Sequence, residues 1–124
     1  MAALYSEILL DHFRHPRNYG SLASPDISNE QFNPLCGDRI RLELKLDGSK
    51  ISDARFKGDG CAISIAAASL LTELILGTDV SEVDNITDAR LISALESDIK
   101  PARRQCALLP LNALREGLED YKTK

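Results

Sequence analysis

The sequence predicts an α+β fold in which helices cover one face of a small antiparallel sheet. Three observations support this prediction. The chain begins with apolar residues at helical spacing, continues with segments in which apolar and polar residues alternate, and ends with several stretches of helical pattern. Grouped strands followed by grouped helices are typical of the α+β class.

The first predicted helix covers residues 2–14. Its apolar side chains recur at helical spacing, and they are Leu4, Tyr5, Ile8, Leu9 and Phe13. Residues 15–20 follow with the sequence HPRNYG, in which Pro16 and Gly20 end the helix. The next segment, residues 21–32, is a polar connection that we expect to contain a short strand near its end.

Two strands are predicted in the middle of the chain. In residues 39–47, apolar side chains alternate with charged ones, which is typical of a strand with one buried and one solvated face. A DGSK turn at residues 47–50 leads into a second strand over residues 51–60, antiparallel to the first. The alternation slips between Ile51 and Phe56, which indicates a bulge in the second strand.

A mostly buried helix is predicted from Cys61 to Leu76, because this stretch is rich in Ala and Leu and is apolar on most sides. Gly77 follows as its C-cap. A further helix is predicted over residues 88–97, with its apolar side chains facing inward.

The last helical stretch contains two prolines. Pro101 suits the first turn of a helix. The pattern from Cys106 to Tyr121 is helical, but Pro110 removes a backbone hydrogen bond and cannot sit in an unbroken helix interior. We therefore expect a helix break close to Cys106 and a new start within residues 108–111.

The 124 residues are enough for one domain, residues 1–124, with a buried core. A formal net charge of -4 argues against a nucleic acid or an anionic membrane as the partner. No apolar run approaches the roughly 20 residues that a membrane span needs. The N-terminus lacks the basic start and the cleavage site of a signal peptide, so we expect a cytoplasmic protein.

Three cysteines are the most informative residues of the chain. Structural disulfides are uncommon in the cytoplasm, and three thiols cannot all pair. Cys36 lies in the sequence NPLCGD, between Pro34, which fixes its own φ, and Gly37, which takes backbone angles that other residues avoid. This setting indicates either a thiol placed for chemistry or a polar turn that contains a small buried thiol.

The predicted topology brings the cysteines together. Cys36 precedes the first clear strand and Cys61 follows the second, so a hairpin places them side by side at its open end. Cys106 can meet them from the predicted helix break, and Asp38 extends from the same loop as Cys36. Three thiolates and one carboxylate form a tetrahedral ligand set suited to zinc or to ferrous iron, in which the carboxylate is the more exchangeable ligand.

The surroundings of the cysteines carry further signals. Cys61 opens a helix whose dipole favours a thiolate. Arg103 and Arg104 lie within a turn of the third cysteine, where they either offset negative charge or remain ordinary solvated side chains. For His12 we expect a surface or helix-packing role, and for His15 a solvated one. The chain has no C-x-x-C pair, so the spacing alone does not match a zinc finger.

Four motifs of the chain resemble the iron–sulfur cluster assembly proteins of the NifU N-terminal, IscU and SufU family. They are LYSEILLDHFRHPRNYG, NPLCGD, GDGCAIS and PARRQCALLPLNAL, which together extend from Leu4 to about Leu118. The resemblance implies a small α+β domain with a three-stranded sheet and a cysteine site at one end. By position, it implies that the metal and cluster ligands are Cys36, Asp38, Cys61 and Cys106.

The resemblance also implies partners and bound groups. Family members receive persulfide sulfur from a pyridoxal-phosphate cysteine desulfurase of the SufS, IscS or NifS type, and they serve recipient apo iron–sulfur proteins. By this resemblance the site would hold Zn2+ at rest, and Fe2+ or a 2Fe-2S cluster transiently.

The motifs are mixed between two branches of the family. GDGCAIS and Arg103, three residues before the last cysteine, resemble the SufU branch, a zinc protein that takes sulfur by ligand exchange. The IscU branch has His directly before that cysteine and a Leu-Pro-Pro-Val-Lys chaperone motif. Gln105 and the sequence DIKPARRQC stand here instead, which argues against docking to a specialised Hsp70. The short segment between the second and third cysteines is IscU-like in length.

We therefore predict an iron–sulfur cluster assembly protein that works as a cluster scaffold or as a zinc-organised sulfurtransferase, and not as a turnover enzyme on its own. Cys106 is the expected sulfur acceptor, because it lies on a helix break that can move, with Arg103 in support. Asp38 is the expected labile ligand. The alternative is a zinc-stabilised protein-interaction module without sulfur chemistry, which metal removal would unfold outright.

Overall fold

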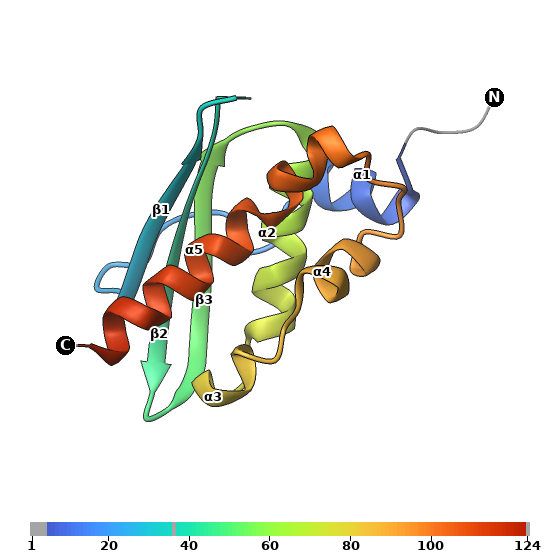
Figure 1. The fold of residues 1–124 in the computed structure, drawn as a ribbon. Helices are drawn as coiled ribbons and strands as arrows, with labels where there is room; N and C mark the ends of the chain where they lie inside the picture. The colour runs from blue at the N-terminus through green and yellow to red at the C-terminus, as the bar shows by residue number, and fades with distance from the viewer. Residues whose placement is uncertain (1–4, 36, 124) are drawn as a thin grey trace.

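The computed structural model describes residues 5–35 and 37–123, and Figure 1 shows their arrangement. The elements follow one another as α1 (Glu7–Arg14), β1 (Ile27–Asn33), β2 (Asp38–Asp47), β3 (Lys50–Asp59), α2 (Ala62–Ile75), α3 (Val80–Val83), α4 (Asp88–Ala94), the 3-10 helix η1 (Pro101–Arg103) and α5 (Arg104–Lys122). A helix, then the strands, then the remaining helices is the predicted order.

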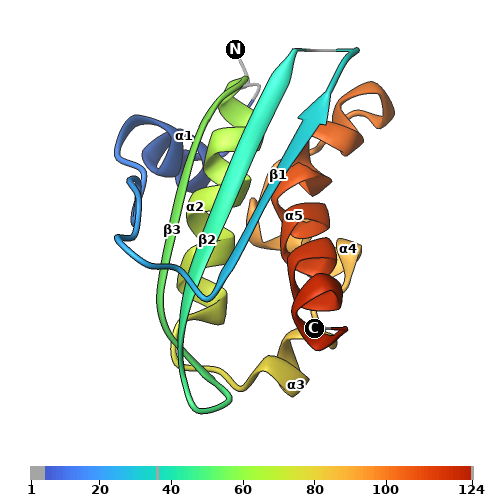
Figure 2. The same cartoon turned by 90° about the vertical axis from the view of Figure 1, so that its left-hand side faces the viewer.

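The three strands form one antiparallel sheet in the order β1-β2-β3. Helix α5 packs against β1 and β2, and α2 packs against β3 and α5, so both long helices cover the same face of the sheet (Figure 2). The inward-facing residues Ile40, Leu42 and Leu44 of β2 and Phe56 of β3 are buried beneath them. The predicted α+β class with a small antiparallel sheet is confirmed, and β1 is the short strand expected near the end of the polar connection.

A bulge interrupts β3 where the sequence pattern slips. Lys45 pairs with Asp53, but Leu46 pairs with Ile51, so Ser52 is an extra residue on β3. The extra residue shifts the alternation by one position, and burial resumes at Ala54 beyond it. The predicted bulge is confirmed.

The outer face of the sheet is less solvated than the alternation predicts. The connection between α1 and β1 first runs along the edge of β3, where Phe56 N–H donates to the Asn18 carbonyl (3.0 Å) and Gly20 N–H donates to the Phe56 carbonyl (2.9 Å). It then crosses the outer face, where Leu22 N–H donates to the carboxylate of Glu43 (2.8 Å). Glu43 is therefore buried although it stands among the polar positions of β2.

Helix α2 is the predicted buried helix. It begins after its N-cap Cys61 and ends at Ile75. Gly77 follows with a φ of +83°, the left-handed conformation typical of a glycine that ends a helix. No helix in the described part of the chain is long and apolar enough to cross a membrane.

Two other helices are shorter than predicted. A capping residue fixes where α1 begins, and Glu96, with a φ of +49°, does not continue the helix beyond α4. Helix α1 begins at Glu7, since the Ser6 side chain accepts a hydrogen bond from Leu9 N–H (3.0 Å). Residues 2–4 of the predicted range lie outside the described residues. Helix α4 ends at Ala94 instead of residue 97, and Leu91 on its inner side is buried as expected.

The predicted helix break at Cys106 is wrong, because α5 is one helix with Pro110 inside it. Proline cannot donate the hydrogen bond that residue 110 would make to the Cys106 carbonyl, at a cost of about 3 kcal/mol. Against this cost, Leu108 and Leu111 are buried, and each buried leucine side chain contributes about 1.5–3 kcal/mol. Burial of the apolar face of α5 therefore outweighs the cost of proline inside the helix. Pro101, in contrast, begins a helical turn, η1, as predicted.

Candidate metal centre

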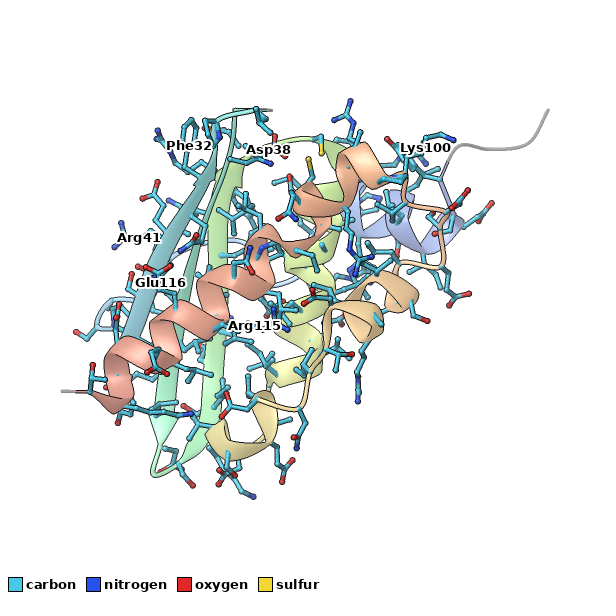
Figure 3. The ribbon with its side chains drawn as sticks, viewed as in Figure 1. Phe32, Asp38, Arg41, Lys100, Arg115 and Glu116 are labelled. Carbon is cyan, nitrogen blue, oxygen red and sulfur yellow. The ribbon has the colours of Figure 1, made fainter. Side chains whose placement is uncertain are left out.

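Three side chains that can bind metal meet at one end of the sheet. Asp38 begins β2, Cys61 is the N-cap of α2, and Cys106 lies in the first turn of α5. Figure 3 shows Asp38 at the start of β2, beside the sulfur atoms at the N-terminal ends of α2 and α5. The β2–β3 hairpin brings Asp38 next to Cys61, and the packing of α5 on α2 adds Cys106.

The spacing of the donor atoms fits a four-coordinate metal ion. One ligand atom from each of Asp38, Cys61 and Cys106 lies within 4.8 Å of the other two. Asp38 Oδ2 is 3.5 Å from Cys61 Sγ. Zinc–sulfur bonds of about 2.3 Å and zinc–oxygen bonds of about 2.1 Å place tetrahedral ligands about 3.6 Å apart. Only small side-chain movements separate this arrangement from a coordinated one.

Asp38 and Cys106 are buried and Cys61 is partly exposed. Asp38 is held in place by Cys61 N–H, which donates to its Oδ1 (3.2 Å). A buried carboxylate beside two thiols is costly unless protons or a cation balance the charge. The composition of this cluster therefore favours a bound cation.

Cys36, the remaining predicted ligand, lies outside the described residues. The described residues on either side of it are both bonded to Asn33, because Leu35 N–H donates to Asn33 Oδ1 (3.1 Å) and Gly37 N–H donates to the Asn33 carbonyl (2.8 Å). Gly37 has a φ of +72°, which explains the glycine at this position. Asn33 pairs with Asp38, so these described residues lie at the same end of the sheet as the cluster.

Gly60, just before Cys61, allows the chain to pass close to the site. A Cβ atom at this position would lie 2.3 Å from Ser64 Oγ and 3.2 Å from Asp38 Cγ. The second glycine of the GDGC sequence, Gly60, therefore allows the backbone to lie close to Ser64 and Asp38. Sequence reasoning missed Ser64, although its position three residues after Cys61 places it in the same turn of a helix.

Arg103 is the charged neighbour of the two thiols. Its pKa is raised, chiefly by the negative charge of Cys61 and then by a hydrogen bond with Cys106. Arg103 itself is exposed to solvent, as is Arg104. The structure thus brings Arg103 to the cysteines, as the sequence suggested, while no contact of Arg104 with them is described.

Neither histidine belongs to the site. His12 is buried between α1 and α2, where its Nδ1 lies 2.7 Å from Ser69 Oγ. Burial lowers its pKa. His15 is exposed. The expected helix-packing role of His12 and the solvated position of His15 are both confirmed.

Known proteins with similar sequences match almost the whole chain. The chain is 41% identical over 132 residues to the zinc-dependent sulfurtransferase SufU of Bacillus subtilis (strain 168), a match that covers 93% of this chain and 89% of that protein. It is 38% identical over 125 residues to the iron–sulfur cluster assembly scaffold protein IscU of Haemophilus influenzae, covering 97% of each chain.

Solved structures and a family model agree with these relatives. A crystal structure described as an iron–sulfur cluster assembly scaffold protein for the SUF system, from Fervidobacterium islandicum AW-1, superimposes with a TM-score of 0.81 at 29% identity, covering 93% of this chain and 96% of the other. A NifU-like N-terminal protein from Brucella abortus shares the fold, with a TM-score of 0.84 at 20% identity over 98% of this chain and 96% of that one. The family model of the NifU-like N terminal domain matches residues 4–124, and the chain belongs to this family.

Proposed function

We propose that this chain is an iron–sulfur cluster assembly protein that accepts sulfur from a cysteine desulfurase. The juxtaposition of Asp38, Cys61 and Cys106 carries the proposal, because two thiols and a carboxylate within 4.8 Å suit both metal binding and sulfur chemistry. The names of the SufU and IscU relatives support it. We further propose that residues 1–124 act as one domain in the cytoplasm.

Four residues would hold the metal, namely Cys36, Asp38, Cys61 and Cys106. Bound zinc would keep the thiols deprotonated and hold them in a tetrahedral arrangement. Asp38 would be the labile ligand, since a carboxylate oxygen is a harder and more exchangeable donor than a thiolate. Cys61 N–H already donates to Asp38 and would hold the carboxylate near the site after it leaves the metal.

Sulfur transfer would proceed by attack of the Cys106 thiolate on the terminal sulfur of a persulfide on the desulfurase cysteine. The sulfur–sulfur bond of that persulfide breaks, and its electron pair leaves with the desulfurase cysteine as a thiolate. The terminal sulfur and its proton become a persulfide on Cys106. Arg103, which is hydrogen-bonded to Cys106, would stabilise the thiolate before the attack.

The assignment of Cys106 as acceptor needs a movement, because Cys106 is fully buried. The helix break that motivated this prediction is absent. Two other features would allow Cys106 to move. The helical hydrogen bond that Pro110 cannot make weakens α5 near Cys106, and the exposed turn η1 precedes α5. A Cys106→Ser variant should not acquire a persulfide when it is incubated with desulfurase and cysteine. A variant that still gains one sulfur by intact mass would make Cys36 or Cys61 the acceptor.

The chain could act in iron–sulfur cluster assembly in either of two ways. As a sulfurtransferase the chain passes persulfide sulfur on, and as a scaffold it builds a 2Fe-2S cluster from Fe2+ and sulfur for recipient apo iron–sulfur proteins. The relative named zinc-dependent sulfurtransferase favours the first mode, and the relatives named scaffolds favour the second. A SufS-, IscS- or NifS-type desulfurase would supply sulfur in both. Docking to a specialised Hsp70 is not proposed.

The metal and acid-labile sulfide content of protein purified without oxygen separates these modes. One zinc per chain without sulfide indicates the sulfurtransferase, and equal iron and sulfide with visible absorbance indicate the scaffold. If metal removal unfolds the protein and no desulfurase is activated, the chain is instead a zinc-stabilised interaction module.

A further inference from the structure

We infer that Ser64 is a positioning residue of this site, whose hydroxyl hydrogen-bonds the sulfur of Cys61 and so sets how firmly that thiolate holds the metal. The inference rests on the proposed function, because it concerns the same metal centre. It adds a residue that does not bind the metal but acts through one that does.

Ser64 lies in the first turn of α2, one helical turn after Cys61, and is fully buried. Its Oγ donates to the Cys61 carbonyl (3.1 Å) and lies 3.9 Å from Cys61 Sγ. When Cys61 is a thiolate, the one hydroxyl proton of Ser64 therefore has two acceptors on the same residue. The Cys61 carbonyl already accepts the helical hydrogen bond of Ile65 N–H (3.2 Å). Rotation of the hydroxyl towards the sulfur thus leaves that carbonyl with a partner.

The backbone at Gly60 passes close to this hydroxyl. A side chain at Gly60 would collide with Ser64 Oγ on one side and approach Asp38 on the other. The chain therefore has no side chain at position 60, where the hydroxyl and the carboxylate converge. An apolar residue of similar size at position 64 would fill the space but could not donate to the sulfur.

The other buried hydroxyls of α2 have partners elsewhere. Ser69 contacts His12 Nδ1 (2.7 Å) and Arg17 N–H (2.9 Å), and Thr72 accepts from Asn18 (3.0 Å), so both tie α2 to α1 and its following loop. The hydrogen-bond partners described for Ser64 all belong to Cys61. Its hydroxyl is therefore placed to act on the site and not on the packing between elements.

A hydrogen bond to a metal-bound thiolate withdraws electron density from the sulfur. The sulfur becomes a weaker donor, and the metal–sulfur bond exchanges more readily. Mutating a group that hydrogen-bonds to a metal ligand typically costs about 10–100-fold in metal affinity or activity, which sets the size of the effect. For a thiolate we expect the opposite sign, because the hydrogen bond weakens the donor. Loss of the Ser64 hydroxyl should therefore make Cys61 a stronger donor and slow the release of the metal.

The test uses the full chain loaded with Co2+, whose absorbance reports thiolate coordination. Ser64→Ala should shift the sulfur-to-cobalt charge-transfer band to longer wavelength and slow metal release to a chelator by about tenfold. Ser64→Thr keeps the hydroxyl and should restore both values. The matched control is Thr78→Val, which removes a hydroxyl that makes the same type of contact, to the Ile75 carbonyl (2.7 Å), at the other end of α2.

The outcomes separate this inference from the proposed function. An unchanged band and release rate in a folded Ser64→Ala variant would overturn the role of Ser64 while the metal site stands. A Ser64→Thr variant that behaves like Ser64→Ala would also overturn it, because the effect would then follow packing and not the hydroxyl. A wild-type chain that binds Co2+ without a thiolate band would refute the proposed function, and this inference with it.

Discussion

Gly60→Ala perturbs the point where three parts of the site come closest. The added Cβ would lie 2.3 Å from Ser64 Oγ and 3.2 Å from Asp38 Cγ. Both neighbours are short, buried side chains, so Ser64, Asp38 or the backbone of the turn has to shift. Overpacking of this kind costs about 1–3 kcal/mol. Each kcal/mol lowers Tm by about 3–5 °C for a chain of this size, so Tm of the metal-free protein should fall by roughly 3–15 °C.

The same movement displaces Asp38 and the start of α2, so zinc affinity should fall at least about tenfold, or about 1.4 kcal/mol. Thermal unfolding of the metal-free protein and competition with a zinc chelator measure the two effects. Gly117→Ala is the control, because its Cβ would meet Ile27 Cγ2 at 2.9 Å between α5 and β1, away from the site. It should leave zinc affinity unchanged. A Gly60→Ala variant that binds zinc as tightly as wild type would refute the close approach.

Two further predictions concern Asp38 and His12. Asp38→Ala removes the ligand that we propose to be exchangeable, so any bound cluster should decay more slowly when its visible absorbance is followed without oxygen. An unchanged lifetime would contradict this role. Burial lowers the pKa of His12 below its usual 6.5, so the unfolded chain binds more protons than the folded one at low pH. The free energy of unfolding should therefore fall as pH drops through about 6.5, and it should level off below the lowered pKa. Urea midpoints at several pH values measure this loss. His12→Gln should flatten the profile, whereas His15→Gln at the exposed histidine should not, and a flat wild-type profile would count against the burial argument.

Local patterns predicted the elements whose structure depends on local chemistry. The alternation in β2 and its slip in β3 predicted a sheet with one buried face and a bulge, because successive side chains of a strand point to opposite faces of the sheet. The breaker residues after α1 and the glycine after α2 marked where those helices end. Placing two of the three cysteines at the ends of a predicted hairpin was enough to anticipate that Cys61 would lie beside Asp38.

The misses depend on contacts between segments far apart in sequence. Pro110 disfavours a helix locally, but burial of the apolar face of α5 in the core stabilises a continuous helix. The spacing of apolar residues in the sequence does not show which of these two effects is larger. Glu43 is buried because a distant connection folds over it. Ser64 was missed for a different reason. Its spacing of three residues from Cys61 is visible in the sequence, but a serine inside an apolar helix commonly bonds to its own backbone and so gives no distinct signal.

The connection that runs along β3 also bears on how readily the protein can self-associate. An open sheet edge is a template on which another chain can add a strand and start aggregation. Asn18 and Gly20 occupy the backbone groups of β3 at Phe56, and Asp79 pairs with Lys50 at the other end of the same strand. Strand addition along β3 is thereby blocked at two places. Displacement of Asn18 and Gly20 from β3 would uncover this edge, and light scattering should then show increased self-association.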